Sequence, residues 1–173
     1  QPLVDNQHGF GVPVYDSETN ISKESHIIGY SKDCSLPTRV TYWIELPDGS
    51  FQPHDNQSEY AFLYRVEQGT INRFIYTMIV PISEQDMGKM GFSSIWNQKL
   101  IYQFQGGSGI GFRQGKARLN RLLKRRQEQL HQGYAVVTST GNKTSYTYNM
   151  MLAEDIARRV KKQFTSQYGE PEY

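Results

Sequence analysis

A glycine-rich turn is the feature of this sequence best suited to chemistry. Four glycines fall within seven residues, just after a strand-like run: Gly106, Gly107, Gly109 and Gly111. Because glycine has no Cβ, the backbone N–H groups of such a turn can converge on an anion. Two anions suit this geometry, a phosphate group and the oxyanion that forms during acyl transfer. A tight turn without any ligand is the third interpretation.

The phosphate-binding patterns fit this turn poorly. A P-loop ends in Gly-Lys-Ser/Thr, where this chain has Gly111-Phe112-Arg113. The dinucleotide pattern Gly-x-Gly-x-x-Gly is met only in part, because Gly111 comes one residue early. Two adjacent glycines after a strand resemble instead the turn of lipases and esterases, where one backbone N–H helps to form the oxyanion hole. The spacing therefore favours an oxyanion loop made of Gly106, Gly107, Ser108 and Gly109.

Side chains that could complete a catalytic site are scarce. No Gly-x-Ser-x-Gly motif occurs, and Ser108 is a poor nucleophile candidate because Gly109 follows it directly. Cys34 is the only cysteine; it is either a small buried residue or a thiol that can bond to another chain. The histidines show no metal-ligand spacing, so we expect neither a metal nor a cofactor. They are His8, His26, His54 and His131.

Basic residues cluster on and just before a predicted helix. They are Arg113, Lys116, Arg118, Arg121, Lys124, Arg125 and Arg126. A charge run of this kind is usually the solvated face of a helix, which is the interpretation adopted here; an anion or partner site is the alternative. The net charge of the whole chain is only +2, which does not indicate a nucleic-acid partner.

The first 95 residues are dominated by strand patterns. β-Branched and aromatic residues predict strands over Arg39–Leu46, Glu59–Val66 and Ile71–Ile82. Pro47-Asp48-Gly49 predicts a turn, and Gln68-Gly69-Thr70 predicts a hairpin loop. The opening 30 residues are polar with scattered Gly and Pro, and we expect them to wrap over the surface.

The half of the chain from residue 96 onward alternates strands and helices. Lys99–Gln105 is a predicted strand, and Tyr134–Ser139 is a continuous apolar run typical of a strand buried on both faces. Between them, Lys116–His131 is a predicted helix with Gly133 as its C-cap. Its leucines fall on one side at helical spacing: Leu119, Leu122, Leu123 and Leu130.

A second helix is predicted over Met151–Tyr168, with Gly169 as its cap. Its apolar side is Leu152, Ile156, Val160 and Phe164. Alternating strands and helices imply a mainly parallel sheet with right-handed crossovers. This helix should lead to another parallel strand, of which only Glu172-Tyr173 is present. We expect either a second polypeptide that completes the sheet edge or a truncated product.

Five segments resemble a family of secreted, mostly bacterial α/β-hydrolase-like proteins, distantly similar to tannases, feruloyl esterases and polyhydroxybutyrate depolymerases. They are Ser31–Val40, Gly69–Tyr76, Trp96–Gly111, Gly133–Gly141 and the tail Gln167–Tyr173. The resemblance covers most of residues 31–173 and implies an α/β fold. Residues 1–95 would be the β-rich N-terminal part of the hydrolase sheet, and residues 96–173 a β-α-β-α part that carries the oxyanion loop.

The resemblance also implies an activity, the hydrolysis of a small-molecule or polymeric ester by a serine nucleophile. In such enzymes the Ser, Asp or Glu, and His of the triad follow in that order, here all beyond Tyr173. We therefore expect the N-terminal chain of a processed two-chain enzyme, with Cys34 available for an interchain disulfide. A chain that begins at Gln1 suggests a mature, secreted or periplasmic protein.

Two other function classes remain open at this point. One is a non-catalytic glycan- or polymer-binding module, which could use the twelve tyrosines of the chain as contact surface. Packing of these tyrosines in the core is the plainer explanation. The other is a phosphate or nucleotide binder. No apolar run approaches the roughly 20 residues that a membrane-spanning helix needs.

Overall fold

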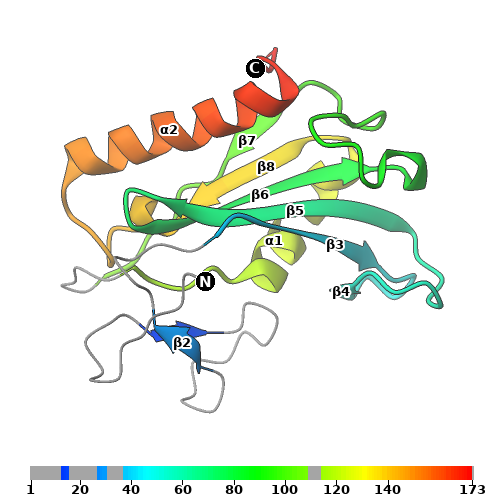
Figure 1. Cartoon of the computed structure of the whole chain (residues 1–173), viewed down its shortest axis with the longest axis horizontal. Coiled ribbons are helices and arrows are strands. Elements are labelled where there is room, and N and C mark those ends of the chain that lie inside the picture. The colour runs from blue at the N-terminus through cyan, green and yellow to red at the C-terminus, as the bar shows by residue number, and fades with distance from the viewer. Residues whose placement is uncertain (1–12, 16–26, 31–36, 109–113, 173) are drawn as a thin grey trace.

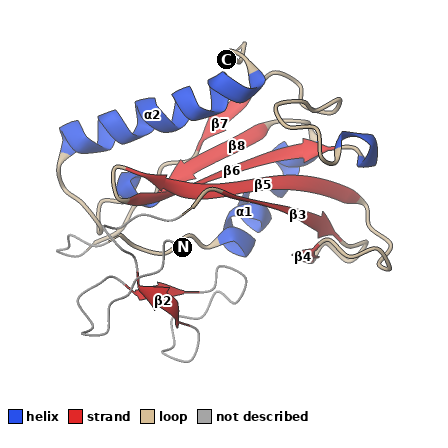
Figure 2. Ribbon diagram, viewed as in Figure 1, coloured by secondary structure: helices blue, strands red, loops and turns tan. Residues whose placement is uncertain are grey.

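The computed structural model describes residues 13–15, 27–30, 37–108 and 114–172. Its main element is a six-stranded mixed sheet with strand order β4-β3-β5-β6-β8-β7, and two helices pack on it (Figures 1 and 2). A separate two-stranded sheet pairs β1 (Pro13–Tyr15) with β2 (Ile27–Tyr30) in antiparallel orientation. These two strands lie in the segment for which the sequence predicted only a surface wrap.

One half of the main sheet is an antiparallel meander. β3 (Arg39–Glu45) pairs with β4 (Phe51–Pro53) on one side and with β5 (Phe62–Ile71) on the other. The predicted turn at Pro47-Asp48-Gly49 connects β3 to β4, and Gly49 has the positive φ of 79° that the turn requires. The strand β4 was not predicted, because three residues are too few to show an alternating pattern.

The hairpin between β5 and β6 (Phe74–Ile82) turns at a different place from the predicted one. Asn72 and Arg73 form the turn with φ values of 50° and 72°, the signs that a tight two-residue hairpin requires. The prediction of a loop at Gln68–Thr70 was wrong, because these residues lie inside β5. A Cβ on Gly69 would lie 2.9 Å from the ring of Tyr76, so this glycine serves close packing between strands.

The other half of the sheet is a strand–helix–strand unit. β7 (Leu100–Tyr102) and β8 (Ala135–Ser139) pair in parallel, and α1 (Leu119–His131) connects them. β8 is fully buried, as the continuous apolar pattern predicted. β8 also pairs in antiparallel orientation with β6, which joins the two halves into one sheet. Parallel pairing is therefore confined to one strand pair of the described sheet, less than the mainly parallel arrangement expected of this half.

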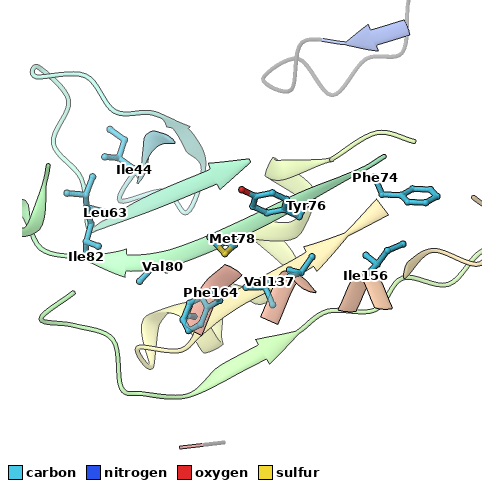
Figure 3. Packing of buried hydrophobic residues seen from close by; sticks show 12 residues of the cluster. Ile44, Leu63, Phe74, Tyr76, Met78, Val80, Ile82, Val137, Ile156 and Phe164 are labelled. Carbon is cyan, nitrogen blue, oxygen red and sulfur yellow. The ribbon is translucent and has the colours of Figure 1, made fainter. Parts of the chain in front are cut away.

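The two helices cover opposite faces of the sheet. Leu119, Leu122, Leu123 and Leu130 of α1 pack with Trp43, Tyr64 and Val66 in one apolar cluster. The second helix, α2 (Met150–Tyr168), packs Ile156, Val160 and Phe164 on the other face, against Tyr76, Met78 and Val137 (Figure 3). All four predicted leucines of α1 are buried, which confirms the helical pattern. Of the predicted α2 residues, Leu152 is only partly buried.

Buried polar groups are matched by specific partners on both faces. On the α1 face, Glu45 accepts hydrogen bonds from the Tyr64 hydroxyl at 2.8 Å and from Gln127 at 2.6 Å, and His131 Nε2 lies 2.8 Å from its Oε2. On the α2 face, Glu67 accepts a bond of 2.8 Å from the Tyr76 hydroxyl. Tyrosines thus help to build the core, in line with the plainer of the two explanations for their number.

Arg65 is a buried cation, with 1% of its surface exposed. Its guanidinium donates to the carbonyl oxygens of Phe92, Asp86 and Lys89, and to the Tyr168 hydroxyl at 2.7 Å. These acceptors lie on the irregular segment after β6 and on the end of α2. Arg65 therefore ties that segment and the helix end to the centre of the sheet.

Candidate functional site

The glycine-rich turn follows the carboxyl end of β7, at the outer edge of the sheet (Figure 1). Beyond the strand, Gln103 N–H still donates to Val137 O at 2.7 Å, and Gln105 N–H donates to Asn142 O at 3.3 Å. Gln105 also forms an isolated parallel bridge with Lys143. The turn therefore begins beside the segment that follows β8. The described part of it is Gly106, Gly107 and Ser108, all exposed.

Gly107 is held against the residues after β8. The Thr144 hydroxyl donates to Gly107 O at 2.7 Å. A Cβ on Gly107 would lie 2.9 Å from Ser145 Oγ, closer than real Cβ atoms approach, and 3.2 Å from Ser145 Cβ. A Cβ on Gly106 would meet nothing within 4 Å. Only Gly107 of the two is therefore required by packing.

Two backbone N–H groups of the described part of this turn lack an intramolecular acceptor there. Across the described residues, no hydrogen bond is made by the N–H of Gly106 or Gly107. Nearby, the Ser145 hydroxyl is buried and has no hydrogen-bond partner among the described residues. Exposed N–H donors beside a buried hydroxyl form an environment that can accept a negatively charged oxygen.

The structure places only some of the remaining predicted site residues. Gly109 and Cys34 lie outside the described residues. His131 belongs to the Glu45 network and stacks on Phe62, with ring centroids 3.9 Å apart. Since α1 ends at His131 and leads into the start of β8, this histidine lies at the amino ends of the parallel strands, away from the glycine turn. Within the described residues, no group of three or more His, Cys, Asp and Glu could hold a metal ion.

A basic pocket of about 100 Å³ adjoins the glycine turn. Gln103, Gln105 and Gly106 line its side toward β7, Leu122 and Tyr146 provide apolar surface, and five cationic side chains provide the rest. The cations are Lys116, Arg118, Arg121, Arg125 and Lys143. No carboxylate of a described residue lines the pocket. Burial, together with the neighbouring positive charge of Arg118, lowers the pKa of Lys116.

The prediction of a solvated helix face agrees with the exposure of four members of the cluster, three of which also line the pocket: Arg118, Arg121, Arg125 and, outside the pocket, Lys124. Lys124 does not line the pocket, and the guanidinium of Arg126 donates to the side-chain oxygen of Gln103. The other described members of the cluster line one pocket together with Lys143, which comes from a different part of the chain. Sequence spacing gave no signal for Lys143 or Tyr146, because the parallel crossover brings them to the turn.

Comparison with known families identifies a relationship for nearly the whole chain. A family model described as the Tannase-like family of unknown function (DUF6351) matches residues 15–173. The chain belongs to this family. Neither a curated protein nor a solved structure matches the chain. Membership of the Tannase-like family supports the distant similarity to tannases inferred from the sequence, and with it a hydrolase ancestry.

The described part of this Tannase-like chain contains two α-helices. Neither α1 nor α2 is long and apolar enough to cross a bilayer.

Proposed function

We propose that this Tannase-like chain supplies the oxyanion loop of a serine esterase. The observation that carries the proposal is the position of Gly106 and Gly107 between a sheet strand and the helix α1. Both residues are exposed, and their N–H groups make no hydrogen bond to a described residue. In α/β-hydrolases, one N–H of the oxyanion hole comes from a strand-to-helix loop of this kind. Ser108 and Gly109 complete the proposed loop.

The open edge of the sheet at β7 offers a position for the strand that would carry the nucleophile. A right-handed crossover through α1, on one face, carries the chain from β7 inward to β8. Because α2 lies on the opposite face, a right-handed crossover through it carries the chain the other way, to the outer side of β7. A nucleophile at the carboxyl end of that next strand would lie beside the turn that follows β7.

Completion of the enzyme then requires polypeptide beyond Tyr173. We propose that a second polypeptide provides the next strand and the Ser, Asp or Glu, and His of the triad. Cys34 is a candidate for a disulfide that links the two chains. The substrate is a small-molecule or polymeric ester, and the protein acts outside the cytoplasm.

Intact-mass analysis of the native protein, with and without reductant and after reaction with a fluorophosphonate, tests each part. A second polypeptide that carries the label, released by reductant, supports the two-chain enzyme with Cys34 in the link. A label on one longer chain supports the esterase and contradicts the processing. Absence of the label from every chain contradicts the esterase. The protein would then be a non-catalytic member of a hydrolase lineage.

A further inference from the structure

We propose that the basic pocket beside the glycine turn binds a negatively charged group of the ester substrate, a carboxylate or a phosphate. That this anion belongs to a substrate rests on the proposed esterase function. The binding of an anion rests on the pocket alone. Among the described residues, five cationic side chains and no carboxylate line it. Of the five, Arg118, Arg121, Arg125 and Lys143 form no salt bridge within the described residues.

Three segments of the chain contribute these cations. Arg121 and Arg125 lie four residues apart on one side of α1, and Arg118 is the residue just before this helix. Lys116 comes from the segment before this helix, and Lys143 from the segment after β8. A solvated helix face needs no cation from outside the helix, so convergence from three segments distinguishes this pocket from such a face.

Like charges held together repel each other, and an anion between them removes that cost. The lowered pKa of Lys116 agrees with this arrangement, because its causes are burial and the charge of Arg118. Guanidinium groups suit carboxylate and phosphate equally, since both anions accept paired N–H donors. Lys143 is itself positioned by the ring of Tyr146, with Nζ 4.4 Å from the ring centroid.

The pocket has room for a carboxylate or phosphate group. Its volume of about 100 Å³ is several times the space that one water molecule needs. Gly106 lines the pocket and also belongs to the proposed oxyanion loop. A substrate whose ester carbonyl lies at the glycine turn can therefore reach the cations with a charged group a few bonds away.

Two readouts on the full native protein and its variants test the inference. The first is calorimetric titration with succinate and with inorganic phosphate, which needs no catalysis. The second is kcat/KM for 4-nitrophenyl hemisuccinate against the neutral 4-nitrophenyl butyrate. The test variant is Arg121→Gln with Arg125→Gln. The matched control, Lys124→Gln with Lys162→Gln, removes the same charge from exposed positions outside the pocket.

We expect saturable anion binding that the test variant weakens about tenfold or more and the control leaves unchanged. The hemisuccinate should lose the same factor and the butyrate nothing. The tighter of succinate and phosphate identifies the anion. Butyrate hydrolysis without any anion preference would overturn the inference and leave the esterase intact. Charge-dependent anion binding without hydrolysis of either ester would support the pocket and contradict the esterase.

Discussion

The backbone N–H of Glu172 donates a hydrogen bond of 2.8 Å to the carbonyl oxygen of Gln98. Gln98 immediately precedes Lys99 and β7, so the segment that leaves α2 lies at the start of the outer edge of this strand. Lys99 and Gln103 direct their backbone bonds toward β8. Backbone groups alternate along a strand, so those of Leu100 and Tyr102 point to the open side, like the carbonyl of Gln98. We predict that a further parallel strand pairs with this edge.

Hydrogen exchange can detect that strand. We expect the amides of Leu100 and Tyr102 to exchange slowly in the native protein with its complete polypeptide, and quickly in the 173-residue chain alone. Gln103, whose N–H bonds to Val137 O, is the internal control and should be protected in both samples. Equal exchange at Leu100 and Tyr102 in the two samples would contradict a strand at this edge.

Gly107→Ala should disturb the turn, whereas Gly106→Ala should not. A Cβ on Gly107 collides with the buried Ser145, and overpacking of this kind costs about 1–3 kcal/mol. The space beside Gly106 is open. Chemical denaturation of both variants measures the difference in unfolding free energy. If the two alanines have the same effect, the close packing of Gly107 against Ser145 is wrong.

Arg65→Met should destabilise the protein by about 3 kcal/mol, because it leaves the carbonyl group of Asp86, which is buried, and those of Lys89 and Phe92 without their donor. Arg158→Met is the matched control, since 73% of the Arg158 side chain is exposed; its effect should stay within about 0.5 kcal/mol. Equilibrium denaturation compares the two. Faster proteolysis within residues 84–96 of the Arg65 variant would locate the effect, and equal stability of both variants would argue against it.

Asp86 gives stability a predictable dependence on pH. Burial raises the pKa of Asp86, but hydrogen bonds from the hydroxyl and N–H groups of Ser94 and Ser83 lower it by more, so the net pKa is depressed. A depressed carboxyl pKa stabilises the fold above the unfolded value of about 3.9, and this contribution is lost as pH falls below it.

Asp86→Asn should therefore cost about 1–3 kcal/mol at pH 7, and the deficit relative to the wild type should shrink as the pH falls below about 4. Denaturant titrations at several pH values measure this change. Glu128→Gln, at an exposed position on α1, is the control for loss of one carboxylate. A deficit that stays constant down to the lowest pH would show that Asp86 does not titrate as described.

The sequence was sufficient for elements whose side chains carry their own pattern. The leucines of α1 and the apolar run of β8 follow local periodicity, and both are buried as predicted. The turn between β5 and β6 was predicted at the wrong position because glycine is typical of turns, and Gly69 is a glycine inside a strand. Its actual role depends on Tyr76, which is its cross-strand partner and is visible only once the strands pair.

The candidate site also has one part that the sequence could locate and one that it could not. The glycine turn could be located from its spacing, since glycine content and the preceding strand are local features. The basic pocket could not, because Lys143 joins the arginines of α1 only through the parallel pairing of β7 and β8. Charge on a helix is ambiguous in sequence. Whether such charges form a solvated face or line a pocket depends on whether another segment of the folded chain lies opposite them.

The first helix carries the pocket arginines on its outer side and its core leucines on the inner side. The glycine turn, by contrast, belongs to the connection that precedes this helix. Charge preference and carbonyl recognition would then be encoded by separate stretches of the chain. Exchange of the outward residues of α1 could redirect the protein to uncharged esters, while the turn and the core remain as they are. The same separation offers an engineer, or natural selection, a means to change specificity without rebuilding the fold.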